Sequence, residues 1–264
     1  MIATLQAARV LERSTPMGGG VELICETPLA ADVHPGQFFQ VAVESPGALL
    51  RRPYSAAWTD PTRGLVGFVF NVVGAGSDWL AARNAGDRID LLGPLGRGFA
   101  IDGGRPAVCV AGGLGIAVFI GLSNALTGRG RSTTILYGAR SADQLLPAAR
   151  FPKTRMQLAT DDGSAGHHGR VTALLSNAIV GDADIFACGP TPMLVELVRW
   201  AQRADVRLAR IQVAHETPMG CGVGTCLGCA LPRAGGGYML TCQDGPCISA
   251  DLVEWTRVVD AFHG

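Results

Sequence analysis

A cysteine-rich segment near the end of the chain places the strongest constraint on what this sequence can fold into. Five of the eight cysteines lie within residues 219–247, in the string MGCGVGTCLGCALPRAGGGYMLTCQDGPC. Four of them, Cys221, Cys226, Cys229 and Cys242, follow the spacing C-x4-C-x2-C-x12-C. This spacing is a known ligand pattern for a [2Fe-2S] cluster held by four thiolates. The intervening glycines can adopt positive φ, so the backbone can wrap closely and point its N–H groups at sulfide.

Two other uses of these cysteines compete with a cluster. A disulfide framework is typical of short secreted chains, whereas this chain has 264 residues and its first residues show no signal peptide. Zinc sites usually pair C-x2-C with a second C-x2-C or with histidines, and the wide x4 opening fits that pattern poorly. The sequence therefore favours iron-sulfur over zinc, and zinc over structural thiols.

Charge and hydropathy exclude several classes of partner. The chain carries 22 basic and 22 acidic residues, so it has no electrostatic footprint for nucleic acid or for an anionic membrane surface. No uninterrupted apolar run reaches the roughly 18 residues of a membrane span. We therefore expect neither nucleic acid nor membrane as a partner, and a reducing cytoplasm as the location.

The first part of the chain reads as short β segments separated by turns. Apolar or alternating runs at residues 21–25, 37–43 and 65–73 are bounded by glycine and proline turns. This pattern predicts a small antiparallel barrel over residues 1–99.

Two short motifs within this part could hold a phosphate-bearing ligand. In the string 51–55, RRPYS, an arginine could neutralise a phosphate and the tyrosine could pack on a flat ring. The string reads equally well as a strand end with an exposed arginine and a core tyrosine. A glycine turn at 72–77 follows, with Ser77 at a predicted helix start where N–H groups could receive a pyrophosphate.

From about residue 100 the pattern changes to alternating strands and helices. An apolar strand at 107–111 leads into a glycine turn at 112–116 and a helix at 117–126, which places helix N–H groups at the carboxyl end of a strand. Alone, such a turn is as often structural. Further predicted elements are strands at 132–137 and 185–187 and a helix at 193–203. They favour a doubly wound parallel sheet, so we predict domains at 1–99, 100–210 and 211–264.

An ordered set of short motifs resembles one known family. The motifs lie at residues 52–55, 72–77, 93–96, 112–115, 137–140, 160–164, 188–190 with Met193, and 221–242 followed by 244–246. Any one of them is common, whereas the ordered set is specific. In this combination the chain resembles the ferredoxin-reductase superfamily, and most closely the iron-sulfur flavoprotein electron-transfer subunit of the two-subunit, NAD-dependent dihydroorotate dehydrogenases.

The resemblance implies a fold and a set of cofactor sites. It implies a multidomain β and α/β chain, with an antiparallel flavin-binding β-barrel, a doubly wound parallel-sheet nicotinamide domain and a small C-terminal [2Fe-2S] domain. FAD would lie on Arg52, Pro53, Tyr54 and Ser55, with Val69, Phe70 and Asn71 nearby and Gly76 and Ser77 at the pyrophosphate. NAD(H) would lie on Gly112, Gly113, Leu114 and Gly115, with Cys188, Gly189, Pro190 and Met193 beside the nicotinamide. Cys221, Cys226, Cys229 and Cys242 would bind the cluster.

The resemblance also implies a direction of electron flow. A nicotinamide exchanges two electrons at once, a cluster passes one, and a flavin can do both, so a flavin must lie between them. We expect electrons to pass from an FMN-bearing catalytic dihydroorotate dehydrogenase subunit through [2Fe-2S] and FAD to NAD⁺, within a heterotetramer in pyrimidine biosynthesis. The chain shows no base or dihydroorotate pocket of its own, so we assign it no catalytic residue for C–H chemistry.

The sequence is also compatible with two other functions, and it does not decide the role of one cysteine. The chain could be the small subunit of a ferredoxin-NAD(P)H reductase or transhydrogenase, or a non-catalytic iron-sulfur flavoprotein redox sensor. Asn71 and Ser77 stand where the family often has a basic residue and a threonine. Cys247 is a fifth thiol, which could be inert or could exchange with Cys242 as a ligand.

Overall fold

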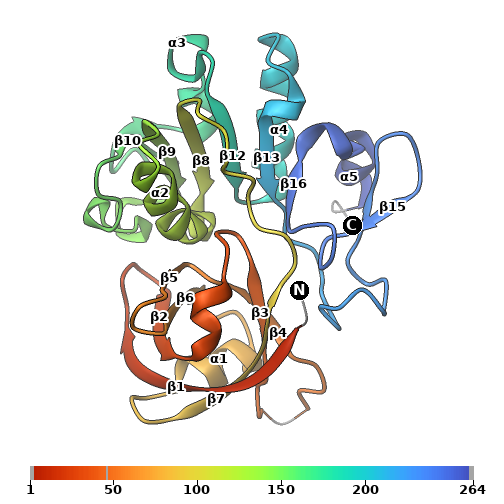
Figure 1. The fold of residues 1–264 in the computed structure, drawn as a ribbon. Helices are drawn as coiled ribbons and strands as arrows, with labels where there is room; N and C mark the ends of the chain where they lie inside the picture. Colours follow the sequence, from red (N-terminus) through yellow and green to blue (C-terminus); the bar gives the residue numbers. More distant parts are fainter. Residues whose placement is uncertain (1–2, 46, 262–264) are drawn as a thin grey trace.

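The computed structural model describes residues 3–45 and 47–261. Within these residues the chain forms two seven-stranded sheets and one two-stranded sheet. Figure 1 shows the antiparallel sheet at the bottom, the parallel sheet above it, and the C-terminal segment beside the parallel sheet. No helix in the described part of the chain is long and apolar enough to span a bilayer.

The first sheet is a curled antiparallel sheet with the strand order β4-β3-β7-β1-β2-β6-β5. Buried Phe39 and Phe68 meet edge to face in its core, with ring centroids 5.7 Å apart. The strands predicted at 21–25, 37–43 and 65–73 are confirmed with shifted ends, and the predicted barrel is confirmed in the coarser form of a curled sheet. The elements of this part are β1 (Thr4–Ser14), β2 (Gly20–Glu26), β3 (Phe38–Val41), β4 (Arg52–Ser55), β5 (Trp58–Asp60), β6 (Leu65–Asn71), α1 (Ala75–Ala81) and β7 (Arg88–Leu95).

The second sheet has the order β11-β10-β9-β8-β12-β13-β16, and its neighbours are parallel except for the antiparallel pair β13–β16. Alternate residues of β8 pack into two different cores, one shared with α2 and the other with α4, so these helices cover opposite faces. The prediction of a doubly wound sheet is confirmed. Its elements are β8 (Ala107–Gly112), α2 (Val118–Gly128), β9 (Thr133–Ala139), β10 (Arg155–Thr160), β11 (His167–His168), α3 (Asn177–Val180), β12 (Asp184–Cys188), α4 (Thr191–Arg203), β13 (Ile211–Ala214) and β16 (Cys247–Ser249).

The predicted third segment contributes strands to the parallel sheet. Both β13 and β16 lie within residues 211–264, so a boundary at residue 210 cuts through this sheet. Residues 215–246 stand outside the two large sheets and include the hairpin of β14 (Ala230–Pro232) and β15 (Tyr238–Leu240). The chain then continues through β16 to α5 (Trp255–Ala261).

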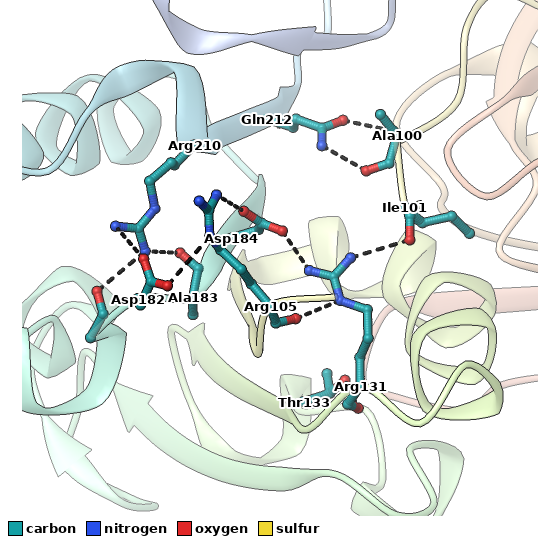
Figure 2. Close-up of polar contacts among 11 residues, drawn as sticks. Ala100, Ile101, Arg105, Arg131, Thr133, Asp182, Ala183, Asp184, Arg210 and Gln212 are labelled. Atoms are coloured by element: carbon teal, nitrogen blue, oxygen red, sulfur yellow. Dashed lines mark hydrogen bonds and ion pairs between the residues drawn. The ribbon is translucent and has the colours of Figure 1, made fainter. Parts of the chain in front are cut away.

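A network of arginines and aspartates ties the amino ends of the parallel strands together (Figure 2). The buried Arg131 guanidinium donates to a carboxylate oxygen of Asp184 at 2.6 Å, to the carbonyl of Arg105 at 2.6 Å and to the carbonyl of Ile101 at 3.3 Å. The side-chain amide of Gln212 exchanges two 2.8 Å hydrogen bonds with the backbone of Ala100. These contacts lie away from the strands' carboxyl ends, where ligands bind in such sheets.

Glu22 on β2 links the antiparallel sheet to the segment after β9. Its carboxylate is 3% exposed and accepts two hydrogen bonds from Arg150, one of 2.8 Å, and another of 2.8 Å from the indole of Trp58. Burial raises the pKa of Glu22, but the hydrogen bonds from Arg150 and Trp58 and the charge of Arg150 outweigh burial and lower it. The carboxylate is therefore held in its charged form at the junction of the two sheets.

We expect Arg131→Met to lower the free energy of unfolding by about 3 kcal/mol, because it leaves the Asp184 carboxylate and two carbonyls without this donor. Urea denaturation of the purified protein measures the change. Arg129→Met is the matched control, since Arg129 is exposed and its loss is expected to cost less than about 0.5 kcal/mol. Equal losses in the two variants would contradict a structural role for the network.

We expect the stability that Glu22 adds to disappear in acid. Its pKa in the folded protein lies below the ordinary value of 4.5, so its contribution is complete above that pH and is lost as the pH falls further. The difference in unfolding free energy between wild type and Glu22→Gln should therefore shrink between about pH 5 and about pH 3. A difference that stays constant over this range would show that the charge of Glu22 is not what joins the sheets.

Candidate functional site

A cavity of ≈ 250 Å³ lies between β4 and the glycine turn before α1. Arg52 and Tyr54 line one side of it, and the turn from Val73 to Ser77 lines the other. A Cβ on Gly76 would lie 3.1 Å from Nε of Arg52, so the glycine allows the guanidinium to lie across the turn. The structure thus brings the two predicted phosphate motifs to opposite walls of one cavity.

The polar side chains of this cavity differ in their charge and in their hydrogen bonds. Burial raises the pKa of Tyr54 to about 12, so its hydroxyl stays neutral, and its ring packs on Phe70 with centroids 5.1 Å apart. The Ser77 hydroxyl accepts hydrogen bonds from the N–H groups of Val73 and Gly74 at 2.8 and 3.0 Å. Ser77 therefore shapes the turn, while Arg52 supplies the positive charge facing the cavity.

Successive side chains of β6, the strand that packs against Tyr54, enter two different cores. On β6, Val69 packs into the core of the parallel sheet and Phe70 into the core of the antiparallel sheet. Asn71 ends the strand with its side chain exposed. The three predicted residues thus lie beside the cavity strand, at the seam between the two sheets.

Two glycine turns face each other at the carboxyl ends of β8 and β12. A Cβ on Gly112 would lie 2.7 Å from Sδ of Met193, and a Cβ on Gly115 would lie 2.3 Å from the carbonyl oxygen of Cys188. Both glycines are needed for this close approach. The structure therefore brings together the predicted residues 112–115 and 188–193.

Glu216 lies beside these turns, and the sequence reasoning missed it. Burial raises the pKa of the Cys188 thiol strongly, and the charge of Glu216 raises it further, so the thiol is neutral. Burial also raises the pKa of Glu216, while the pKa of neighbouring His215 is lowered by burial to about 4. Both follow β13, which pairs with β12. The signal for Glu216 was a carboxylate directly after a short strand, and that strand was not predicted.

The cysteine loop holds its four predicted ligands as two pairs. The sulfurs of Cys229 and Cys242 are 3.2 Å apart, and Cys226 contributes hydrogen bonds to Cys221. The N–H of Gly224 donates to Sγ of Cys242 at 3.1 Å, and the N–H of Val223 donates to Sγ of Cys221 at 3.4 Å. The backbone of this loop is therefore already directed at sulfur.

The thiols differ in charge. Burial raises the pKa of Cys221, but hydrogen bonds from the Thr225 hydroxyl and from nearby backbone N–H groups lower it to about 5. Burial and the neighbouring Cys229 raise the pKa of Cys242 to about 12. Cys221 is thus the readiest thiolate, which is the form that binds metal.

The donor set agrees in its chemistry with an iron-sulfur cluster. Across residues 3–45 and 47–261, no group of three or more His, Cys, Asp or Glu side chains converges closely enough to hold a metal ion, the four cysteines included. They nevertheless share one loop whose glycines 222 and 224 have φ of 75° and 80°. Four thiols with N–H donors to sulfur are the groups that an iron-sulfur cluster uses.

Cys247 is not part of this loop. It lies on β16, is buried, and its thiol is 3.7 Å from the carbonyl oxygen of Gly36, while burial and the neighbouring Cys188 of the same sheet raise its pKa. The structure therefore favours the inert reading of Cys247 and gives no support to exchange with Cys242.

The cysteine loop packs directly on the antiparallel sheet. Buried Cys229 and Cys242 form one apolar cluster with Phe38 of β3 and Leu95 of β7. The N–H of Arg97, just after β7, donates to the carbonyl of Gly245. Because β3 also pairs with β4, the loop and the Arg52 cavity lie against neighbouring strands.

Solved structures share this fold. The structure of an NADH-dependent reduced ferredoxin-NADP oxidoreductase, described for flavin-based electron bifurcation, aligns with a TM-score of 0.83 at 28% identity, over 96% of this chain and 91% of that one. A ferredoxin reductase in carbazole 1,9a-dioxygenase aligns with a TM-score of 0.71 at 24% identity, over 81% of this chain and 69% of that one. The second likeness concerns the fold alone.

Sequence comparisons give the family. A family model described as the iron-sulfur cluster binding domain of dihydroorotate dehydrogenase B matches residues 216–254. The electron transfer subunit of dihydroorotate dehydrogenase B (NAD(+)) from Shouchella clausii is 37% identical over 234 residues, which cover 85% of this chain and 88% of that protein. Its counterpart from Geobacillus thermodenitrificans is 36% identical over 241 residues, covering 88% and 91%. The chain therefore belongs to the family of electron transfer subunits of dihydroorotate dehydrogenase B (NAD(+)).

Proposed function

We propose that this chain relays electrons from a catalytic dihydroorotate dehydrogenase subunit to NAD⁺, with FAD and a [2Fe-2S] cluster as its resident groups. One observation carries the proposal: the cysteine loop packs on β3, the strand that also pairs with the Arg52 strand. Relatives that bear this name are similar to the chain over 85% and 88% of its length.

The residues that would hold FAD line the cavity between β4 and α1. Arg52 would face the negative charge of the ligand, Tyr54 would pack against a flat ring, and Ser77 keeps the glycine turn open by bonding the turn's own backbone. A bound flavin supplies the exchange between two-electron and one-electron chemistry. On this proposal, residues 1–99 form the flavin domain.

The residues that would meet NAD(H) lie at the carboxyl ends of β8 and β12. In the turn 112–115, Gly113 has no heavy atom within 4 Å of where a Cβ would lie, so this part of the turn would be open to the dinucleotide, as such turns are in doubly wound sheets. The buried, neutral Cys188 thiol and the Glu216 carboxyl lie together at the inner end of this site. We assign them to orienting the nicotinamide and excluding water. The nicotinamide domain would comprise residues 100–210 together with β13 and β16.

The four cysteines 221, 226, 229 and 242 would hold the cluster, and the surface around Cys226 would face the partner. Leu49, Leu227 and Val223 are exposed by 95%, 65% and 37%, and Leu50 lies against Gly220 of the loop. Exposed apolar side chains beside a redox loop fit a protein interface. We assign this face to an FMN-bearing catalytic subunit, within a heterotetramer, in the cytoplasm, where the free thiols would stay reduced.

A second candidate function rests on the structural comparison. The NADH-dependent reduced ferredoxin-NADP oxidoreductase matches 96% of this chain at 28% identity, which favours a ferredoxin-linked reductase as the alternative. In that case the Cys226 face would accept a ferredoxin instead of a dehydrogenase subunit. The higher identity to the dihydroorotate dehydrogenase subunits favours the first function.

We expect Cys226→Ser to separate the two redox sites. The variant should lose the cluster's visible absorbance but still have its flavin bleached by NADH within seconds, at a rate within about twofold of wild type, because Cys226 is not among the residues packed against the glycine turns. Leu227→Ser, in the same exposed loop, is the control that should keep both signals. Anaerobic stopped-flow absorbance measures them. A wild-type flavin that NADH fails to bleach would overturn the proposed function.

A further inference from the structure

Gln40 on β3 is a buried side chain that the fold leaves without partners. It is 0% exposed, and neither its Nε2 nor its Oε1 has a hydrogen-bond partner among the described residues. Gln37, three residues earlier and equally buried, is fully used: its Oε1 accepts from the N–H of His34 and its Nε2 donates to the carbonyl of Gly96, both at 2.8 Å. Leaving a buried amide unsatisfied destabilises the folded protein, so the presence of Gln40 here points to a ligand that would bond it.

The Gln40 amide is directed at the cysteine loop. A Cβ placed on Gly222 would lie 2.6 Å from Cγ and 2.9 Å from Nε2 of Gln40. Gly222 has a φ of 75° and lies directly between Cys221 and Val223, the residue whose N–H donates to Sγ of Cys221. The glycine thus allows the amide to reach the backbone of the loop beside a predicted ligand.

The backbone of Gln40 is tied to the flavin side of the molecule. Gln40 stands opposite Pro53 in the β3–β4 ladder, and its carbonyl accepts a hydrogen bond of 3.2 Å from Arg51. Arg51 and Pro53 flank Arg52 of the cavity. The side chain therefore points to one candidate redox site from a strand that pairs with β4, the strand that lines the other.

We propose that Gln40 is a positioning residue for the cluster, whose side-chain N–H donates to sulfur at the Cys221 side of the loop and raises the reduction potential of the cluster. The proposal rests on the function proposed above. Hydrogen bonds to cluster or ligand sulfurs stabilise the reduced, more negative state, and such outer-shell donors tune the potentials of iron-sulfur centres. The amide also explains why position 222 is glycine, since a side chain there would displace it.

The test compares Gln40→Met with Gln37→Met in the protein carrying flavin and cluster. Gln40→Met keeps the length of the side chain and removes the donor, so the midpoint potential of the cluster should fall. An expected tenfold change in the equilibrium constant for a one-electron couple corresponds to about 59 mV. Gln37→Met removes two protein hydrogen bonds, so it should lower the stability and leave the potential unchanged. Redox titration followed by electron paramagnetic resonance measures the potential, and urea denaturation measures the stability.

Each outcome decides the proposal. A wild-type potential in Gln40→Met, or an equal shift in Gln37→Met, overturns it. If Gln40→Met does not retain the cluster, Gln40→His supplies a ring N–H at similar reach. Retention by the histidine variant supports the proposal, and loss in both shows a packing role and overturns it. A Gln40→Met protein that shows the cluster signal at an unaltered potential would contradict this inference alone. A wild-type protein with no cluster signal would contradict the proposed function.

Discussion

The packing of the cysteine loop on the antiparallel sheet is the contact on which the rest of the arrangement depends. Cys229 and Cys242 are buried against Phe38 and Leu95, so two of the four thiols are part of an apolar core, whereas Cys221 is partly exposed and Cys226 is exposed. This asymmetry gives the loop an inner side toward β3 and an outer side toward solvent. A redox group held here would be protected on one side and accessible to a partner on the other.

The cysteines differ in how readily they lose a proton, and burial is the main reason. Burial raises the pKa of Cys188 and Cys247, which keeps these thiols protonated and unreactive at the seam between the two sheets. Hydrogen bonds lower the pKa of Cys221, which is partly exposed in the loop, to about 5. The sequence contains eight cysteines, yet the fold presents thiolate character at the loop and withholds it from the nicotinamide side.

Strong apolar runs made much of this fold predictable. Residues 107–111 and 185–187 are continuous and apolar because β8 and β12 are buried on both faces. By contrast, β1 is largely exposed and alternates with charged residues, and β13 has only four residues, so neither produced a clear pattern. Glu216 was missed for the same reason. The glycines at 112 and 115 were predicted from a ligand motif, whereas their close approach to Met193 and Cys188 became evident only in three dimensions.

The lack of hydrogen-bond partners for the Gln40 side chain among the described residues could not be predicted from the sequence. Gln37 and Gln40 occupy the same short segment, and only the tertiary contacts with Gly96 and Gly222 distinguish a satisfied amide from an unsatisfied one. The motifs could likewise identify the four cysteines but not which two are buried. Contacts between residues far apart in the sequence decide both the hydrogen bonding of Gln40 and the burial of each cysteine. The residues on either side of these positions do not reveal them.

We propose that electrons from the partner subunit enter this chain through the cysteine loop and pass on to NAD⁺. The most direct measurement is anaerobic NADH formation from dihydroorotate and NAD⁺ by the complex of this chain with its catalytic subunit. We expect NADH formation with the wild-type chain and its loss with Cys226→Ser. NADH formation at the wild-type rate by the Cys226→Ser complex would contradict a route through the cysteine loop.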